Sequence, residues 1–294
     1  RWSFDCGSVN EELCHCLEES YRARVGVSTR IMQRLDKDDM NIPFEAHRKL
    51  DSVELLCVGT ELLMGQIVNT NASNLAKRIA DLGLNSYYQT VVGDHPERMK
   101  EAMHQALGRS DVVLVTGGLG PTDDDLSMEI AAEVAGQPMI FDEEAWETIQ
   151  TYFSRQDRST PPNNRKQAYR PKNAYSIPNH NGTAPGAIVP VDQSGKTHFI
   201  ILLPGPPREN LFMFDETVAP FLAHHREQNL RSIFVQMQGI GESHAVDIVE
   251  DLIQGQSNPT IAPYASEGQV TFRLTQSIEH PDDPDLIAPL LHEI

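Results

Sequence analysis

The sequence has few cysteines, few basic residues and no long apolar run. Its 294 residues include four cysteines, of which three lie within the first sixteen positions, so no disulfide framework spans the chain. No apolar run approaches the roughly 18 residues that a membrane-spanning helix needs. Against 42 Asp and Glu residues there are 24 Lys and Arg residues, and the formal net charge of -18 repels polyanions. We therefore expect no membrane and no nucleic acid as partner, and any anionic ligand must be small and held in a locally positive or metal-loaded pocket.

Several common catalytic motifs are absent as well. The chain has no complete Walker motif (Gly-x-x-x-x-Gly-Lys-Ser/Thr) and no Gly-x-Ser-x-Gly, His-Glu-x-x-His or Cys-x-x-Cys motif, which excludes P-loop hydrolysis, α/β-hydrolase chemistry, zincin proteolysis and thioredoxin-type redox chemistry. Cys14, His15 and Cys16 have the wrong spacing for a zinc knuckle. No charged-then-apolar leader is present at the first residues, and we expect a cytoplasmic protein.

The order of apolar segments predicts two domains behind an extension. Residues 1–52 are charge-rich and carry no catalytic signature, so we interpret them as an extension of unknown role. From residue 53, strand-like and helical segments alternate, which predicts a doubly wound, mostly parallel α/β domain over residues 53–230. A small α+β module is expected over residues 231–294. The first domain is predicted to contain strands at 53–58, 84–92, 111–116, 187–191 and 198–203 and helices at 71–82, 97–107, 123–135, 142–155 and 208–224.

The strongest functional signal is TGGLGPTDDDLS at residues 116–127. It follows a predicted buried strand and opens a predicted helix, so Gly117, Gly118 and Gly120 are expected to bring backbone N–H groups close to a phosphate, with Thr122 beside them. Three carboxylates follow, and beside a phosphate they would repel it unless a cation lay between. We favour a divalent metal held by Asp124 and Asp125. The alternative is that these acids only complement the helix dipole.

Two further clusters are expected near this loop. Glu61, in the GTELLMG segment after the first strand, and Asn71 are placed at the carboxyl edge of the sheet, where they would face the same ligand. A tight turn with a helix cap at residues 69–71 is the alternative. The NRKQ segment contributes Arg165, Lys166 and Gln167 to a group of six basic residues between positions 155 and 172, which favours an anion site over a solvated loop.

Two Gly/Pro-rich turns complete the candidate pocket. The first is NGTAPG, with Gly182 and Thr183, and the second is LPGPPRE, with Pro204, Gly205 and Glu209. The second follows an apolar strand and leads into a helix, so such a rigid turn could form a wall of the pocket. A lone Gly-rich turn at residues 239–243 is interpreted as structural.

Taken together, these segments resemble the CinA competence/damage-inducible protein family. Five motifs occur in the family's order, namely GTELLxG with TN, TGGLGPTxDD, NRKQA, GTAPG and LPGPPxE. The resemblance runs from about residue 53 to the chain end, and Ser127 stands where a threonine is commoner in the family. It implies a MoaB/Mog-like molybdopterin-binding fold followed by a KH-like module. In some members a separate carboxy-terminal domain deamidates nicotinamide mononucleotide, and we expect no such activity from these 294 residues.

The resemblance also implies an activity. Family members are associated with hydrolysis of ADP-ribose at its pyrophosphate, with a divalent metal (cobalt or magnesium) and a potassium requirement. On this hypothesis Asp124 and Asp125 hold the metal, Lys166 with Arg165 stabilises phosphate charge, and the remaining candidates bind a small-molecule nucleotide. A homodimer is expected. The rival hypotheses are a pterin- or nucleotide-binding module without chemistry, and adenylyl transfer to a pterin. The substrate-binding candidates are Glu61, Asn71, Gly117, Gly118, Gly120, Thr122, Arg165, Gln167, Gly182, Thr183, Pro204, Gly205 and Glu209.

Overall fold

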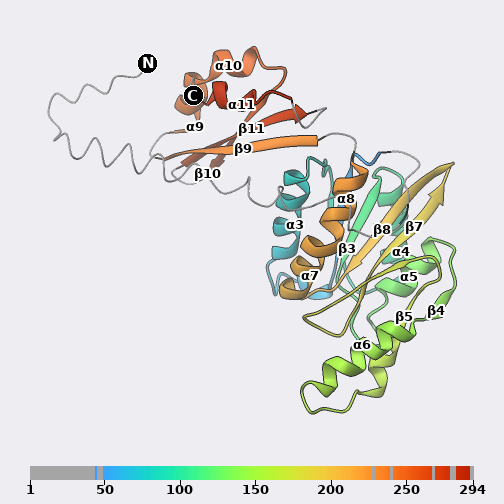
Figure 1. Ribbon diagram of the computed structural model, residues 1–294. Coiled ribbons are helices and arrows are strands. Elements are labelled where there is room, and N and C mark those ends of the chain that lie inside the picture. The colour runs from blue at the N-terminus through green and yellow to red at the C-terminus, as the bar shows by residue number, and fades with distance from the viewer. Residues whose placement is uncertain are drawn as a thin grey trace. The chain divides into compact units, whose positions relative to one another are not determined.

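The computed structural model describes residues 44, 49–226, 229–238, 241–266, 269–278 and 283–291 (Figure 1). In this part of the chain one compact unit ends at Asn229 and another begins at Leu230. Every helix in the described ranges is too short or too polar to cross a bilayer. The cysteines predicted not to form a zinc site, Cys14 and Cys16, lie outside the described residues.

The first unit is built on a six-stranded sheet with the strand order β2-β1-β3-β8-β7-β6. The first four strands in this order are parallel, and β7 and β6 run antiparallel to their neighbours. The prediction of a doubly wound, mostly parallel sheet is therefore confirmed. The strands are β1 (Val53–Val58), β2 (Gln89–Val92), β3 (Val112–Thr116), β6 (Tyr175–Ile177), β7 (Gly186–Gln193) and β8 (Lys196–Leu203).

Helices cover both faces of this sheet (Figure 1). Helices α3 (Thr70–Asp81), α7 (Pro207–Met213) and α8 (Ala219–His225) pack on one face, and α4 (Pro96–Leu107) and α5 (Ser127–Val134) pack on the other. Side chains of a strand alternate between faces, and in β1 Leu55 and Cys57 accordingly join the first core while Leu56 and Val58 join the second. Every residue of β1 and β3 is buried, because helices cover both faces of the sheet.

Local chemistry explains where the helices begin and end. The Asn69 side chain accepts a hydrogen bond from the Ala72 amide at 3.1 Å and caps α3, which is the structural alternative considered for this segment. Gly83 follows α3 with a φ of 77°, a conformation that favours glycine. The helix predicted at 208–224 is interrupted by a π-helical turn (Phe214–Val218) ahead of Pro220, which has no N–H to donate in the regular register.

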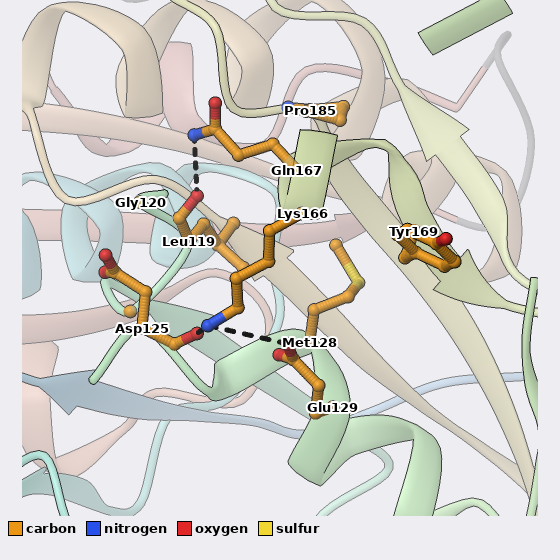
Figure 2. Close-up of a pocket in the computed structure, with 10 residues that line it drawn as sticks. Leu119, Gly120, Asp125, Met128, Glu129, Lys166, Gln167, Tyr169 and Pro185 are labelled. Carbon is orange, nitrogen blue, oxygen red and sulfur yellow. Dashed lines mark hydrogen bonds and ion pairs between the residues drawn. The ribbon is translucent and has the colours of Figure 1, made fainter. Parts of the chain in front are cut away.

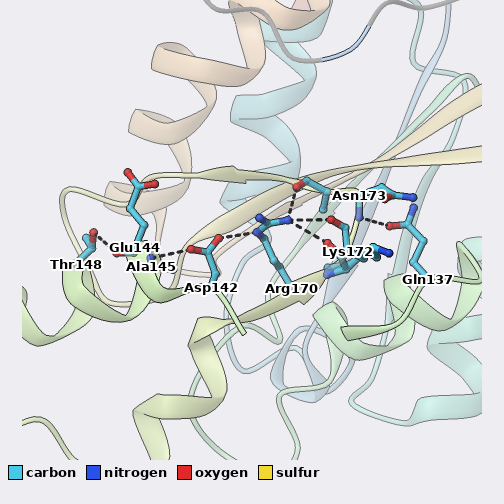
Figure 3. Close-up of polar contacts among 10 residues, drawn as sticks. Gln137, Asp142, Glu144, Ala145, Thr148, Arg170, Lys172 and Asn173 are labelled. Carbon is cyan, nitrogen blue, oxygen red and sulfur yellow. Dashed lines mark hydrogen bonds and ion pairs between the residues drawn. The ribbon is translucent and has the colours of Figure 1, made fainter. Parts of the chain in front are cut away.

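The loop predicted over residues 159–185 contains regular structure. Strands β4 (Met139–Phe141) and β5 (Tyr169–Pro171) form a two-stranded sheet. Between them in the sequence lie α6 (Glu143–Ser154) and a 3₁₀-helix (Pro162–Ala168). Asp142 caps α6 by accepting from the Ala145 amide at 3.1 Å, and it also pairs with Arg170 at 2.6 Å (Figure 3). Arg170 in turn donates to the carbonyl of Ala174 at 2.7 Å, so this ion pair joins α6 to the chain that leaves β5.

The boundary of the amino-terminal extension differs from the expectation. Leu50 is fully buried in the main core, and Phe44 packs against Phe199 with ring centroids 6.1 Å apart. Leu50 also pairs with Arg226 as a parallel bridge, and Ser52 pairs with Asn85. Residues 49–52 therefore belong to the folded unit, because Leu50 lies in its core and the amides of Asp51 and Ser52 donate to the Asp111 carboxylate.

The second unit is a three-stranded antiparallel sheet with helices. Its strand order is β10-β11-β9, and Phe272 and Leu274 of β11 are fully buried beneath Ala245 and Val249. The turn predicted at residues 239–243 is described only from Gly241 onward. The elements are β9 (Asn229–Gln238), α9 (Glu242–Ile248), α10 (Glu250–Gln254), β10 (Thr260–Ser266), β11 (Gln269–Ile278) and α11 (Ile287–Leu290).

Candidate active site

A cleft of about 400 Å³ opens at the carboxyl edge of the sheet, beyond the ends of β1, β3 and β8. Ligand sites in open α/β sheets form at this edge, and the volume lies in the range usual for small-molecule sites. Most of the predicted substrate-binding residues meet here, although they come from five separate segments. The cleft is lined by Val58, Gly59, Glu61, Asp94, Gly117, Gly118, Leu119, Gly120, Pro121, Asp124, Asp125, Gln167, Thr183, Ala184, Pro204, Gly205, Pro206 and Glu209.

The glycine turn after β3 is shaped first by packing. Gly117 has a φ of 97°, and a Cβ there would lie 2.3 Å from the carbonyl oxygen of Val58. The Gly117 amide donates to the Leu203 carbonyl at 3.0 Å, which ties the turn to the end of β8. Gly118 has a φ of 67°, and a Cβ there would meet Ser127 Oγ at 2.3 Å. Both glycines are therefore required by the backbone path, independently of any ligand.

The next amides of the turn are available to a ligand. Within the described residues, the N–H groups of Gly118, Leu119 and Gly120 donate to no other protein group. Gly117 is the exception among the predicted cradle residues, because its amide is used by Leu203. Consecutive unpaired amides in a turn form a concave site for anionic oxygen atoms.

The acidic residues lie in a loop, and this corrects the helix predicted from residue 123. Helix α5 begins at Ser127, so Asp124 and Asp125 precede its first turn, and Glu129 is the acidic residue within that turn. The aspartates therefore do not lie in the first helical turn, where the helix-dipole alternative placed them. The Thr122 amide donates to Asp125 Oδ2 at 3.0 Å, and the Ser127 amide donates to the Gly118 carbonyl at 3.0 Å, so the loop folds back on the glycine turn.

Asp124 and Asp125 are held close together. Thr122 Oγ1 lies 2.5 Å from Oδ1 of Asp124 and 2.5 Å from Oδ2 of Asp125. A hydroxyl donates one hydrogen at a time, so it can satisfy only one of these carboxylates at once. The hydrogen bond from Thr122, with smaller contributions from the local backbone and from the charge of Lys166, holds the pKa of Asp124 below its ordinary value. Asp124 therefore stays ionised at neutral pH.

The opposite wall of the cleft contains a half-buried carboxyl group. Glu209 lies at the start of α7, and its Oε2 accepts a hydrogen bond from Asn179 Nδ2 at 2.6 Å. A Cβ on Gly182 would lie 2.0 Å from the same oxygen, so the glycine at this position makes room for the carboxyl group. Burial raises the pKa of Glu209, and the hydrogen bond from Asn179 opposes this rise.

The NRKQ segment donates hydrogen bonds to the backbone of the glycine turn and the acidic loop, and it places no basic side chain in the cleft lining. Lys166 Nζ donates to the carbonyl of Thr122 at 2.8 Å and to that of Asp125, and it lies 3.5 Å from a carboxylate oxygen of Glu129. Gln167 Nε2 donates to the Leu119 carbonyl at 2.9 Å (Figure 2). The ammonium group predicted to stabilise phosphate is thus engaged with backbone oxygens. Its contacts indicate a positioning role for the loop.

Two further arginines of the basic cluster are also engaged in structural contacts. The Arg165 guanidinium lies 4.2 Å from the centre of the Phe141 ring and 5.7 Å from that of Trp146. Arg170 pairs with Asp142. Arg165 is absent from the cleft lining, so the structure does not bring this predicted phosphate ligand to the other candidates.

Two residues at the β1 end of the cleft have clear structural partners. Asn71 Nδ2 donates to the Gly205 carbonyl at 2.7 Å, which places Asn71 behind the LPGPPRE turn rather than in the lining. Asp94 Oδ2 accepts from the amide and the hydroxyl of Thr60 at 2.9 and 2.8 Å. His95, the residue after Asp94, occupies the N-cap position of α4. Asp94 and Asn179 are the residues of this site that sequence reasoning missed, since an isolated polar residue in a loop gives no signal.

The cleft is acidic. Its lining includes the carboxylates of Glu61, Asp94, Asp124, Asp125 and Glu209, and no lysine or arginine is among the described residues that line it. An anion would be repelled by this lining unless a cation accompanied it. In the described ranges, no three or more His, Cys, Asp and Glu side chains stand close enough together to enclose a metal ion by themselves.

Comparisons with known proteins define the class. Residues 54–224 match the family model described as "Probable molybdopterin binding domain", and residues 234–294 match the model of the damage-inducible protein CinA KH domain. The cleft therefore lies in a molybdopterin-binding-type domain. The chain belongs to the CinA family of competence/damage-inducible proteins.

Individual relatives agree with this assignment. The chain is 46% identical over 242 residues to a competence-damage inducible protein of Clostridium novyi, covering 82% of this chain and 58% of that protein. It is 48% identical over 227 residues to the corresponding protein of Clostridium acetobutylicum, covering 77% of this chain and 54% of that protein. The chain thus spans little more than half the length of these relatives. The crystal structure of CinA from Thermoplasma acidophilum is 34% identical, with a TM-score of 0.50, covering 56% of this chain and 94% of that one.

Proposed function

We propose that this chain is a metal-dependent pyrophosphohydrolase that cleaves ADP-ribose or a similar nucleoside diphosphate to AMP and ribose phosphate. The observation that carries the proposal is the juxtaposition of two kinds of group in one cleft. Unpaired amides of Gly118 to Gly120 suit phosphate oxygens, and the adjacent carboxylates of Asp124 and Asp125 suit a hard cation. A pyrophosphate with its cation is a ligand class that suits both.

The residues present fit a cation that keeps part of its water shell. Asp124 and Asp125 converge on one hydroxyl, and a Cβ on Gly120 would lie 2.3 Å from Asp125 Oδ2, so the glycine leaves the carboxylate room to reach the cleft. Magnesium is commonly held by one or two carboxylates together with waters and substrate phosphates. When bound, such a cation neutralises charge on phosphate oxygens and lowers the pKa of water.

The chain's own groups would then do the remaining work. The amides of Gly118, Leu119 and Gly120 bind and orient phosphate oxygens, and the rigid Pro204–Gly205 turn limits the opposite side. Thr122 keeps the two aspartates together, while Lys166 and Gln167 hold the backbone that carries them. Positioning of this kind is the main contribution that a protein makes to phosphoryl transfer.

Product identity tests the proposal. The protein is incubated with ADP-ribose in potassium buffer with magnesium or cobalt, with a chelator control, and the products are separated by chromatography. We expect AMP and ribose phosphate in amounts that depend on the metal. Binding of ADP-ribose without AMP would favour the binding module. Pyrophosphate released from ATP in the presence of a pterin would favour adenylyl transfer instead.

A further inference from the structure

Glu209 differs from Glu54 and Asp142, two other sequestered carboxylates of the main unit. Glu54 and Asp142, whose side chains are 1% and 13% exposed, pair with Arg109 and Arg170 at 2.7 and 2.6 Å. Glu209 is half-buried, yet the donor that the structure gives its carboxyl group is the neutral amide of Asn179. A carboxyl group withdrawn from water without a cationic partner binds a proton more readily than a paired one.

The surroundings of Glu209 are built around its carboxyl group. Asn179 is 5% exposed, and its amide nitrogen also donates to the Ala184 carbonyl at 2.9 Å, so the donor is held in place from two sides. Asn179 Oδ1 accepts from the Asn181 amide at 3.0 Å, which shapes the turn that brings Gly182 against Glu209. The NGTAPG and LPGPPRE turns therefore meet at this carboxyl group. One of its oxygens is oriented by Asn179, and the group lines the cleft.

The carboxyl groups on the two walls of the cleft have pKa values that are shifted in opposite directions. Hydrogen bonding keeps the pKa of Asp124 low, whereas burial raises that of Glu209. Divergent environments of this kind separate a group that stays charged from one that binds a proton more readily. A base is most effective when its pKa approaches the working pH.

From this geometry we propose that Glu209 is the general base of the hydrolysis, with Asn179 as its positioning residue, an inference that rests on the proposed function. The Glu209 carboxylate takes a proton from the attacking water while the water oxygen forms a bond to phosphorus. The bridging P–O bond breaks, and its electron pair leaves with the departing phosphate. The proton then passes from Glu209 to a phosphate product or to solvent, so that one water is consumed for each AMP and ribose phosphate released.

The test compares Glu209→Gln with the wild type and with Glu216→Gln as a matched control. Glu216 lies in the following π-helical turn, is exposed and is absent from the cleft lining. We expect Glu209→Gln to lower kcat about 10²- to 10⁴-fold. Its affinity for α,β-methylene-ADP, a non-hydrolysable probe, should stay within about threefold by calorimetry with magnesium present. The acidic limb of the pH–rate profile should disappear, and Glu216→Gln should match the wild type.

A second variant gives a change that a merely structural role would not produce. Asn179→Ala removes the hydrogen bond that opposes the rise in the pKa of Glu209. The acidic limb of the kcat profile should then move to higher pH, because more protons must be removed before the base is available. Glu209→Asp, which keeps a carboxyl group, should recover part of the activity that Glu209→Gln loses.

The outcomes separate the two proposals. If the wild type releases no AMP under any metal condition, the hydrolase is rejected and the base with it. If the wild type is active and Glu209→Gln retains its kcat, or loses only probe affinity, the hydrolase stands and the base is rejected. An acidic limb that persists unchanged in Glu209→Gln also rejects the base.

Discussion

The carboxylates near the two ends of strand β1 differ in whether a basic side chain neutralises them. Near its beginning, Glu54 is buried and neutralised by Arg109, whose guanidinium makes two hydrogen bonds of 2.9 and 2.7 Å, and it accepts a third from Thr90 at 3.0 Å. Beyond its end, the cleft gathers carboxylates with no arginine or lysine in the described lining. Natural folds pair the charges that they bury. The end of β1 at which the carboxylates lack basic partners is therefore the end suited to binding a ligand.

The largest effect is expected from the acidic loop. Asp125→Asn keeps the shape of the side chain and an oxygen for the Thr122 amide, but it removes half of the proposed cation-binding charge. Turnover of ADP-ribose should fall about 10³-fold or more, as when a group that stabilises the transition state is removed. The measurement is kcat for AMP release, with the thermal midpoint as a check of folding.

Asp123→Asn is the matched control for this variant. Asp123 is exposed and does not line the cleft, so its loss should leave turnover near that of the wild type. Equal losses in the two variants would mean that overall loop charge matters rather than the placement of Asp125. Normal metal-dependent turnover in Asp125→Asn would remove this residue from the site.

A smaller effect is expected at Gly182. Alanine fits the backbone there, but its Cβ would overlap the Glu209 carboxyl group and displace it. Displacement of a reacting group by about 1 Å can cost 10²-fold in rate, so kcat should fall about 10²-fold with little change in the thermal midpoint. Gly241→Ala is the control, since a Cβ at that position meets nothing within 4 Å. A Gly182→Ala variant with normal kcat would show that the position of Glu209 is unimportant.

Removal of the Arg170–Asp142 ion pair should lower the free energy of unfolding and leave the catalytic activity unchanged. Arg170→Ala leaves Asp142 without its cation and leaves the carbonyls of Ala174 and Lys172 without a donor. We expect a loss of about 2 kcal/mol in the free energy of unfolding, measured with denaturant. Activity per folded molecule should be kept. Arg155→Ala, at an exposed position after α6, serves as the control, and an equal loss there would argue against the pair.

The smallest effect concerns acid stability. Burial, with the nearby charges of His224 and Lys49, lowers the pKa of His225 to about 4 against 6.5 for an ordinary histidine, and a hydrogen bond with the Phe44 backbone opposes this only in part. Between these values the unfolded chain binds more protons, so the free energy of unfolding falls as the pH is lowered from 6.5 to 4. The contribution should be about 1–2 kcal/mol after allowance for partial solvent screening.

Denaturant unfolding at pH 7 and pH 4.5 measures this effect. His225→Phe keeps a ring against Phe199 and Phe221 and should flatten the pH dependence. His104→Gln, at an exposed position on α4, should keep the wild-type slope. A wild-type slope in His225→Phe would mean that other groups are responsible.

Much of the fold follows from sequence periodicity, while the site depends on contacts between distant segments. The bounds of α3, α4 and α6 lie within a residue or so of those predicted, because their apolar spacing and caps are local. The start of α5 was predicted four residues early, at Asp123. Asp123 to Asp125 look like a first helical turn, but Lys166, some forty residues away, holds their backbone in a loop.

The same reasoning explains the candidate site. Glycine and proline turns after buried strands predicted most of the cleft lining, since parallel strands end at one edge. The basic NRKQ segment was misleading, because a local excess of charge does not reveal that Lys166 is used by backbone carbonyls or that Arg165 lies on aromatic rings. The tendency of Glu209 to hold a proton depends on burial and on Asn179, neither of which is visible in sequence.

The most direct test asks whether the acidic cleft needs a cation to hold a pyrophosphate. Calorimetry with α,β-methylene-ADP is performed on the wild type with magnesium and again with excess chelator. The account predicts at least tenfold tighter binding with magnesium, and it predicts that Asp125→Asn loses most of this gain while Asp123→Asn keeps it. Equal affinity in magnesium and in chelator would contradict the account, because the carboxylates would then bind no cation that the phosphates require.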